Sequence, residues 1–222
     1  MILSLHIPKT AGVTIRNVLK RHFGPGFVLW YWQITDAWGR VHPDVPAGAD
    51  CVHGHVAADQ LAAKFPFGRL ITWVRDPVQR VVSSYYHRLR DPDWQHPVCL
   101  ELHRKKLSLA DYAALPLVRN EMSRFFGRTR PDDYLFIGVV EEFDASFCRM
   151  RQLLGISDAT AGCDNRNPAK VGERYELDPG LHQEILQLNA ADALLYASCL
   201  ARTDTASGAV GRRLSWTFQT VR

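Results

Sequence analysis

The chain has 222 residues, 46% of them hydrophobic, so it can form one domain with a buried core rather than a disordered chain. Its 27 basic and 23 acidic side chains give a formal net charge of +4, which suits an anionic ligand but does not indicate nucleic-acid binding. The five cysteines are odd in number and form no C-x-x-C pair, so we expect reduced, mostly buried thiols rather than disulfides or a zinc site.

Targeting and membrane signals are missing from the sequence pattern. No segment has the roughly 18 consecutive apolar residues of a membrane span. Residues 1–7 form a short apolar run without the basic and long apolar regions of a secretory leader. We therefore expect a cytoplasmic protein with no membrane span, and the sequence leaves the oligomeric state open.

The first half of the chain predicts two strand–loop–helix units. Residues 2–7 form an apolar run typical of a buried strand, and residues 13–23 have helical periodicity after a loop at 8–12. Residues 27–34 are aromatic and β-prone, residues 51–53 end another strand, and residues 57–64 predict a short helix. Residues 69–74 predict a second buried strand, followed by a helix to about residue 89 with Asp76 as its cap and Pro77 in its first turn.

The second half continues the alternation of strands and helices. Residues 91–106 read as irregular and polar, residues 109–127 as two short helices, and residues 134–140 as a strand. Residues 143–154 predict a helix ended by Gly155, residues 163–174 a polar loop, and residues 181–201 one long amphipathic helix. The alternation predicts an α/β fold with a mostly parallel sheet flanked by helices, as a single domain over residues 1–202 with a C-terminal tail at 203–222.

Two strand-to-helix turns carry residues that suit phosphate binding. In the first, Lys9, Thr10 and Thr14 surround the start of a helix, where free N–H groups and the helix dipole attract anions. The pattern is not a Walker A loop, because G-x-x-x-x-G-K-[ST] is absent. In the second, Arg75 ends a strand and Ser83 lies about two helical turns further on, so both side chains can hold one phosphate. Each turn taken alone is equally consistent with an ordinary capped helix.

Together, the two turns resemble the signature of a known enzyme family. Residues 6–14, HIPKTAGVT, resemble the 5′-phosphosulfate loop of Golgi-type carbohydrate sulfotransferases, and residues 74–87 resemble their 3′-phosphate motif R-D-P-x-x-R-x-x-S-x-Y. The H-G-H-V element at residues 53–56 is similar to that of heparan sulfate and dermatan sulfate 2-O-sulfotransferases. Residues 136–143 and 188–196 are similar to later family segments, so the resemblance spans residue 2 to about residue 202.

The resemblance implies a P-loop-like sulfotransferase fold, 3′-phosphoadenosine 5′-phosphosulfate (PAPS) as donor, and a carbohydrate hydroxyl as acceptor, with no metal. Lys9 would contact the transferring sulfuryl group and the bridging oxygen. Arg75 and Ser83 would hold the 3′-phosphate. The 5′-phosphate would be wrapped, largely through backbone N–H groups, by Thr10, Ala11, Gly12, Val13 and Thr14.

The general base is expected among two histidines. His53 and His55 are two residues apart, so both point to one face if the strand continues through them. We expect His55 to be the base, because it lies nearer the strand end and is the second histidine of the element. His53 would orient or hold the acceptor. The acidic limb of the rate profile is then expected at about pH 6–7, where a free imidazole titrates.

Several interpretations remain open at this level. A P-loop-type kinase and a catalytically silent nucleotide-binding scaffold are the alternatives to a sulfotransferase. The acceptor and the sulfated position are not determined. The aromatic residues Trp30, Tyr31, Trp32 and Trp38 can stack on sugar faces or belong to the core, and residues 165–170 can close over the nucleotide or form a surface loop.

Overall fold

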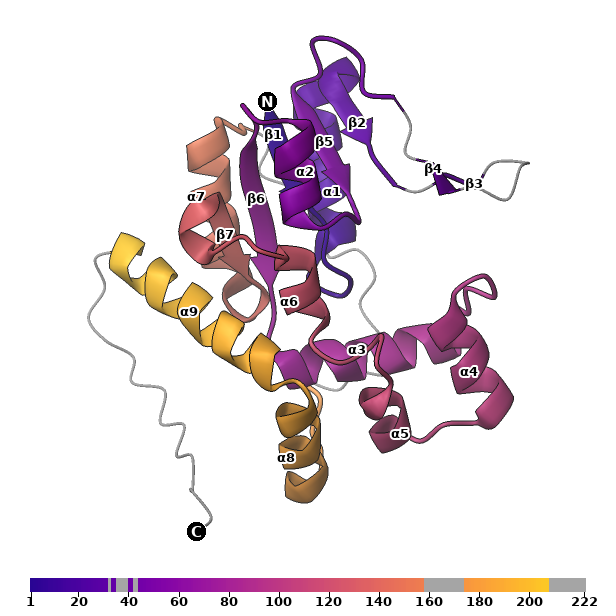
Figure 1. Ribbon diagram of the computed structural model, residues 1–222. Helices are drawn as coiled ribbons and strands as arrows, with labels where there is room; N and C mark the ends of the chain where they lie inside the picture. Colours follow the sequence, from indigo (N-terminus) through magenta and orange to yellow (C-terminus); the bar gives the residue numbers. More distant parts are fainter. Residues whose placement is uncertain (32, 35–39, 42–43, 158–173, 208–222) are drawn as a thin grey trace.

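The centre of the computed structural model is a five-stranded parallel sheet, and the structure describes residues 1–31, 33–34, 40–41, 44–157 and 174–207 (Figure 1). The strand order is β2-β5-β1-β6-β7, and every neighbouring pair runs parallel. The bounds are β1 (Ile2–Leu5), β2 (Phe27–Leu29), β5 (Cys51–Gly54), β6 (Arg69–Val74) and β7 (Tyr134–Val139). A separate antiparallel pair joins β3 (Gln33–Ile34) and β4 (Arg40–Val41). The predicted α/β class is confirmed.

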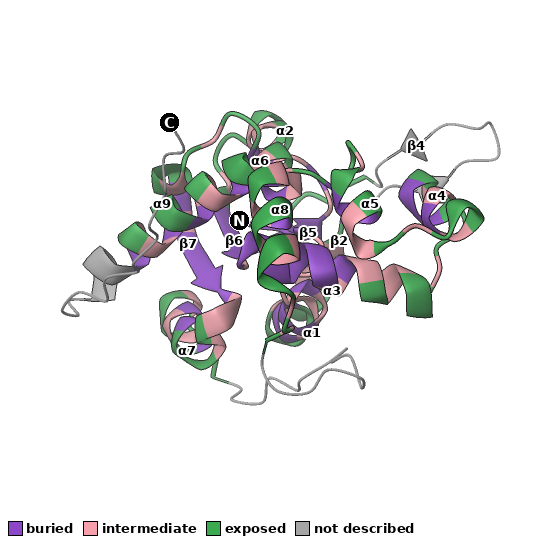
Figure 2. Ribbon diagram, turned by 90° about the horizontal axis from the view of Figure 1, so that it is seen from below, coloured by how far each residue is buried: buried purple, intermediate pink, exposed green. Residues whose placement is uncertain are grey.

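Helices cover both faces of the sheet, as Figure 2 shows. One face carries α1 (Gly12–Phe23) and α7 (Phe143–Leu154), and the other carries α2 (Ala58–Lys64), α6 (Glu121–Phe126) and α9 (Ala190–Ser207). In β6, Ile71 and Trp73 pack toward α1 and α7, whereas Leu70 and Val74 face the other layer. Burial on both sides explains why the strand reads as a continuous apolar run.

A third group of helices lies at the carboxyl end of the strands, at the bottom of Figure 1. It contains α3 (Pro77–Arg90), α4 (Pro97–Lys105), α5 (Leu109–Ala114) and α8 (Pro179–Leu188), which share one apolar cluster. The predicted start of α3 is observed, because the Asp76 carboxylate accepts a hydrogen bond from the N–H of Gln79 at 3.0 Å and Pro77 occupies the first turn. Short 3₁₀ turns occur at Gly24–Gly26, Pro131–Asp133 and Val140–Glu142.

The structure corrects two sequence expectations. Residues 91–106 are not irregular throughout, because α4 forms there, with Pro97 at its start and Val98 and Leu102 buried on one face. The predicted single helix at 181–201 is two helices that meet at buried Asn189, whose side-chain oxygen accepts from the N–H of Asn120 at 3.0 Å. A tertiary contact therefore sets the break, which helical periodicity does not reveal.

The C-terminal helix α9 continues through residue 202, the predicted end of the domain, and stops at Ser207. None of the helices in the described part of the chain has the length and apolarity needed to cross a bilayer.

Arg80 joins three helices from a fully buried position at 0% exposure. Its guanidinium donates to the Glu121 carboxylate and, at 2.9 Å, to the carbonyl of Val118, while Nε lies 3.9 Å from Asp192. Asp192 in turn accepts from the N–H of Ser123 at 2.7 Å and so caps α6. The second arginine of the 74–87 segment therefore holds α3, α6 and α9 together.

We predict that Arg80→Ala lowers the free energy of unfolding by about 3–5 kcal/mol, because it leaves buried carboxylates unpaired. Urea denaturation followed by circular dichroism measures the change. The control is Lys105→Ala, which removes an exposed ion pair with Glu101 and should have little effect. A loss below about 1 kcal/mol for Arg80→Ala would show that the network is not needed for stability.

Candidate functional site

The loop between β1 and α1 has an unusual backbone conformation. Lys9 and Ala11 have φ angles of 68° and 65°, a left-handed conformation that is unfavourable for residues other than glycine. No side chain caps α1, so the first N–H groups of this helix are left available at the positive end of its dipole. Left-handed turns of this kind form concave anion sites from successive N–H groups. The strained backbone therefore supports the phosphate-binding prediction for residues 9–14.

The two threonines of this loop have different surroundings. Thr10 is 1% exposed, and its hydroxyl donates to the carbonyl of Ile7 at 2.9 Å, so it stabilises the loop instead of offering a free donor. Thr14 is buried in the first turn of α1, and Val13 beside it is half-buried. Gly12 is required, because a Cβ there would lie 1.8 Å from the ring of His6.

Lys9 and Arg75 form one cationic site, although they follow different strands. Nη1 of Arg75 donates to the carbonyl of Lys9 at 3.2 Å, which links the two predicted phosphate-binding turns. Burial and the positive charge of Arg75 lower the pKa of Lys9 to about 8, with Arg90 and Arg88 adding to the effect. A bound anion would offset this repulsion and keep the lysine protonated.

Glu141 holds Arg75 in place, and the sequence analysis did not single it out. It follows β7, and its Oε1 accepts from the N–H of Asp76 at 3.1 Å and lies 3.9 Å from Nε of Arg75. Its other oxygen accepts from the Tyr196 hydroxyl at 2.9 Å. The available signal was its position immediately after a strand at the carboxyl edge of the sheet.

Ser83 shares a face of α3 with two residues whose charges interact with Lys9. Ser83, His87 and Arg90 follow one another at spacings of three or four residues, which places them on one side of the helix. Arg90 lowers the pKa of Lys9, and the charge of Lys9 in turn lowers the pKa of His87. Ser83 is half-buried, and its predicted role as a phosphate donor stays a prediction.

His55 lies beside this loop, in an orientation that leaves one ring nitrogen for a substrate. Its Nδ1 lies 2.6 Å from the carbonyl of His6, so Nδ1 carries the proton and Nε2 is the acceptor. Burial lowers the pKa of His55 to about 4, below the free-imidazole range expected from the sequence. The imidazole is therefore neutral at pH 7, as a general base must be.

His53 has a different environment from His55. It is 1% exposed in β5, and its Nδ1 pairs with the Ser4 hydroxyl of β1 at 2.8 Å. Its Nε2 is buried without a hydrogen-bond partner in the described part of the chain. Burial lowers the pKa of His53 to about 3. His53 thus packs within the sheet, while His55 lies past the end of β5 at a half-buried position.

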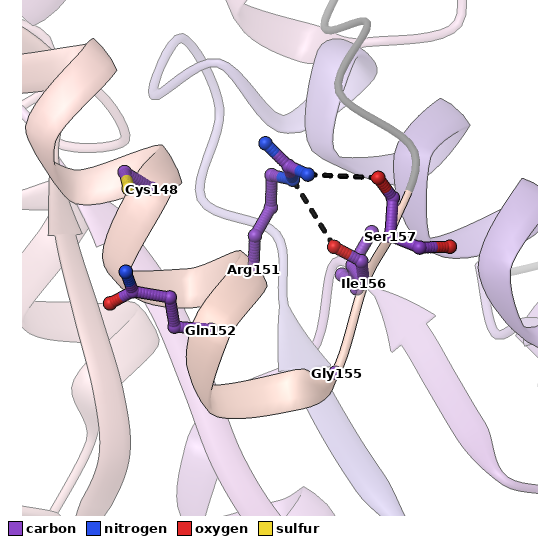
Figure 3. A pocket seen from close by; sticks show the side chains of 6 residues that line it. All are labelled: Cys148, Arg151, Gln152, Gly155, Ile156 and Ser157. Atoms are coloured by element: carbon purple, nitrogen blue, oxygen red, sulfur yellow. Dashed lines mark hydrogen bonds between the residues drawn. The ribbon is translucent and has the colours of Figure 1, made fainter.

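A cavity of about 210 Å³ opens next to His55. Its walls come from α2, α6 and the segment before α2, and the lining residues are His55, Val56, Ala57, Gln60, Arg124 and Phe125. A larger cavity of about 320 Å³ lies at the end of α7, where Arg151 donates to the carbonyls of Ile156 and Ser157 (Figure 3). That second cavity contains none of the predicted site residues, so its size does not identify the site.

Of the aromatic residues that the sequence offers for stacking on sugars, the structure describes Trp30 and Tyr31, and their surroundings differ. Trp30 is 4% exposed and belongs to the core, in edge contact with Phe65. Tyr31 is half-buried and stacks on His55 with ring centroids 4.8 Å apart. Trp32, Trp38 and residues 165–170 lie outside the described residues, as does Cys163. Cys51, Cys99 and Cys199 are buried free thiols, whereas Cys148 is exposed.

Comparisons with known proteins establish the fold. No family model and no curated protein matches the sequence. The structure is similar to mouse sulfotransferase SULT7A1 complexed with PAP, with a TM-score of 0.51, 15% identity, and coverage of 94% of this chain and 88% of that one. A sulfotransferase from Alicyclobacillus acidocaldarius matches with a TM-score of 0.47, 18% identity, and coverage of 89% and 95%. The chain therefore has the sulfotransferase fold.

We predict that the protein loses stability as the pH falls below about 6.5, the ordinary pKa of the histidines that are buried here. The folded-state pKa of His53 is lower than its unfolded value, so the unfolded chain binds more protons in acid. The pKa difference of His53 alone should lower the free energy of unfolding by about 2 kcal/mol between pH 7.5 and pH 5. Urea denaturation at several pH values measures the slope.

His53→Asn keeps a polar atom for Ser4 and should flatten this dependence, even if it lowers stability at pH 7.5. The matched control, His22→Asn at an exposed position on α1, should keep the parent slope. Equal slopes for the parent and His53→Asn would contradict the prediction.

Proposed function

We propose that this protein is a PAPS-dependent O-sulfotransferase that transfers a sulfuryl group to a carbohydrate hydroxyl. The observation that carries the proposal is the hydrogen bond from Arg75 to the carbonyl of Lys9, which brings together the two turns that we propose bind phosphate. β1 lies between β5 and β6 in the sheet, so His55 stands beside the same site from the opposite side. One donor with two separate phosphate groups fits this arrangement.

The proposed reaction is an in-line displacement at sulfur. The acceptor hydroxyl gives its proton to Nε2 of His55, and its oxygen forms a bond to sulfur. The bond from sulfur to the bridging oxygen of the 5′-phosphate breaks, and the electron pair stays on that oxygen. Lys9 and the N–H groups at the start of α1 stabilise the developing negative charge. The products are a sulfate ester, adenosine 3′,5′-bisphosphate and a proton that His55 later releases.

The fold supports this donor class over the alternatives. SULT7A1, on the same fold, was crystallised with PAP, which is the desulfated form of the proposed donor. A P-loop-type kinase would use a Walker A loop, and the loop at residues 6–14 lacks that pattern. A silent scaffold would not need a neutral imidazole at the loop that also carries the lysine. Within the described residues, no cluster of potential metal ligands is found.

Donor selectivity is the first test. We predict that the protein binds adenosine 3′,5′-bisphosphate much more tightly than ATP or AMP, as measured by isothermal calorimetry. Arg75→Ala should weaken this binding by roughly 30- to 1000-fold, because a charge-assisted contact in a half-buried site is lost. Ser83→Ala should cost about 1 kcal/mol. Equal or tighter ATP binding would favour the kinase and reject the proposed donor.

Turnover of histidine variants tests the base. We predict that His55→Ala lowers kcat by about 100-fold or more at saturating PAPS, with donor affinity changed only a few-fold. His53→Ala should have the smaller effect, provided circular dichroism shows that it folds. Because burial lowers the pKa of His55 to about 4, the parent should remain active well below pH 6. An active His55→Ala variant would place the base elsewhere.

The acceptor is identified by incubating glycans of different classes with PAPS and the protein, followed by mass spectrometry. A mass increase of one sulfuryl group on a sugar supports the carbohydrate acceptor. Transfer only to phenols or other non-sugar hydroxyls would retain the sulfotransferase and reject the carbohydrate assignment.

A further inference from the structure

Two residues outside the predicted site surround the proposed base. His6 directly follows β1 and is 7% exposed. Its ring stacks on that of His55, with ring centroids 4.0 Å apart and an interplanar angle of 25°. Tyr31 follows β2 and stacks on the same imidazole at 4.8 Å and 20°. The hydroxyl of Tyr31 lies 2.6 Å from Nδ1 of His6. His55 is therefore in contact with a pair of residues that are themselves hydrogen-bonded.

The direction of the hydrogen bond between Tyr31 and His6 is assigned from the donors and acceptors around it. Arg16, which carries donors only, also interacts with the Tyr31 hydroxyl, so the phenolic oxygen accepts from that side. Burial raises the pKa of Tyr31 to about 12, so the phenol keeps its proton. Nδ1 of His6 lies 2.6 Å from this hydroxyl, so we assign the phenolic proton to that bond and the proton of neutral His6 to Nε2.

His6, His53 and His55 form a cluster in which protonation of one ring disfavours protonation of the others. The rings of His6 and His53 have centroids 5.0 Å apart, and His6 lies 4.0 Å from His55, so two protonated rings would repel strongly. Burial and the neighbouring His55, His53, Arg16 and Lys9 together lower the pKa of His6 well below its ordinary value.

In the described part of the chain, the charged groups that act on His6 are positive. Arg124 and Phe125 of α6 line the cavity next to His55, and Tyr31 covers the other side. Among the described residues, the groups that affect the pKa of His6 are all histidine, arginine or lysine. A proton on His6 would therefore oppose the protonation of His55 during catalysis.

We propose that Tyr31 is a positioning residue for the base: by donating to Nδ1 of His6, it keeps His6 neutral and fixed, so that His55 receives the acceptor's proton. This inference rests on the proposed sulfotransferase function for its catalytic consequence. The hydrogen bond occupies the lone pair at which His6 would otherwise be protonated, and the stacked rings of His6 and Tyr31 hold the ring of His55, which lines the cavity. Gly12 makes this possible, since a side chain there would displace the His6 ring.

The test uses Tyr31→Phe, which keeps the stacked ring and removes the hydroxyl. Histidine titrations by nuclear magnetic resonance on nitrogen-15-labelled protein, without substrate, should show His6 titrating about one pH unit or more higher than in the parent. At saturating PAPS, kcat should fall by a larger factor at pH 5.5 than at pH 8, because protonated His6 opposes proton uptake by His55. The affinity for adenosine 3′,5′-bisphosphate should change only a few-fold.

Three further variants separate positioning from packing. In Tyr31→Phe combined with His6→Asn, no titratable His6 remains, so the extra loss at pH 5.5 should disappear relative to His6→Asn alone. The matched control is Tyr134→Phe, which removes a buried hydroxyl bonded to Thr129 at 3.0 Å on β7, and its pH profile should follow the parent.

The inference is overturned if Tyr31→Phe lowers kcat equally at all pH values and leaves the His6 titration unchanged. It is also overturned if the extra acid sensitivity persists without His6. Failure of the proposed function gives a different result: the parent itself then binds no adenosine 3′,5′-bisphosphate and transfers no sulfuryl group. In that case the titration of His6 still decides whether Tyr31 holds it neutral.

Discussion

The backbone of the loop at residues 6–12 is the constraint on which the site depends. The carbonyl of His6 accepts from His55, and the carbonyl of Lys9 accepts from Arg75, so one loop orients a residue from each neighbouring strand. This loop shape requires energetically unfavourable left-handed φ angles at Lys9 and Ala11. Because the loop receives both contacts, a shift of its backbone would move the proposed base and the proposed phosphate ligands together.

Positive charges gather on one side of the loop at residues 6–12. Burial and the charge of Arg75 lower the pKa of Lys9 to about 8, and Arg88 and Arg90 add to the positive field. On the other side of the loop, buried imidazoles remain neutral. Binding of a donor with several negative charges would relieve the first repulsion and make a proton on His55 less unfavourable. Donor binding and base strength are thus expected to be coupled through electrostatics.

Local sequence signals predicted most of the secondary structure. The helix at Phe143–Leu154 has the predicted bounds, and α3 begins at the predicted cap, because capping residues, proline and apolar spacing act over a few residues. The failures occurred where long-range contacts decide. Asn189 breaks a helix by bonding to Asn120, and α4 forms because its apolar face packs on α3.

The sequence by itself determined the α/β class and the two strand-to-helix turns that carry Lys9 and Arg75, because both are written in contiguous residues. Only the tertiary structure decided the strand order, which places β5 and β6 on either side of β1. It also distinguished His53 from His55. An extended strand directs both to one face, but the strand ends at Gly54, so His53 is fully buried in the sheet while His55 is half-buried beyond it. The contacts of Glu141, His6 and Tyr31 join residues distant in the chain, so no local pattern could reveal them.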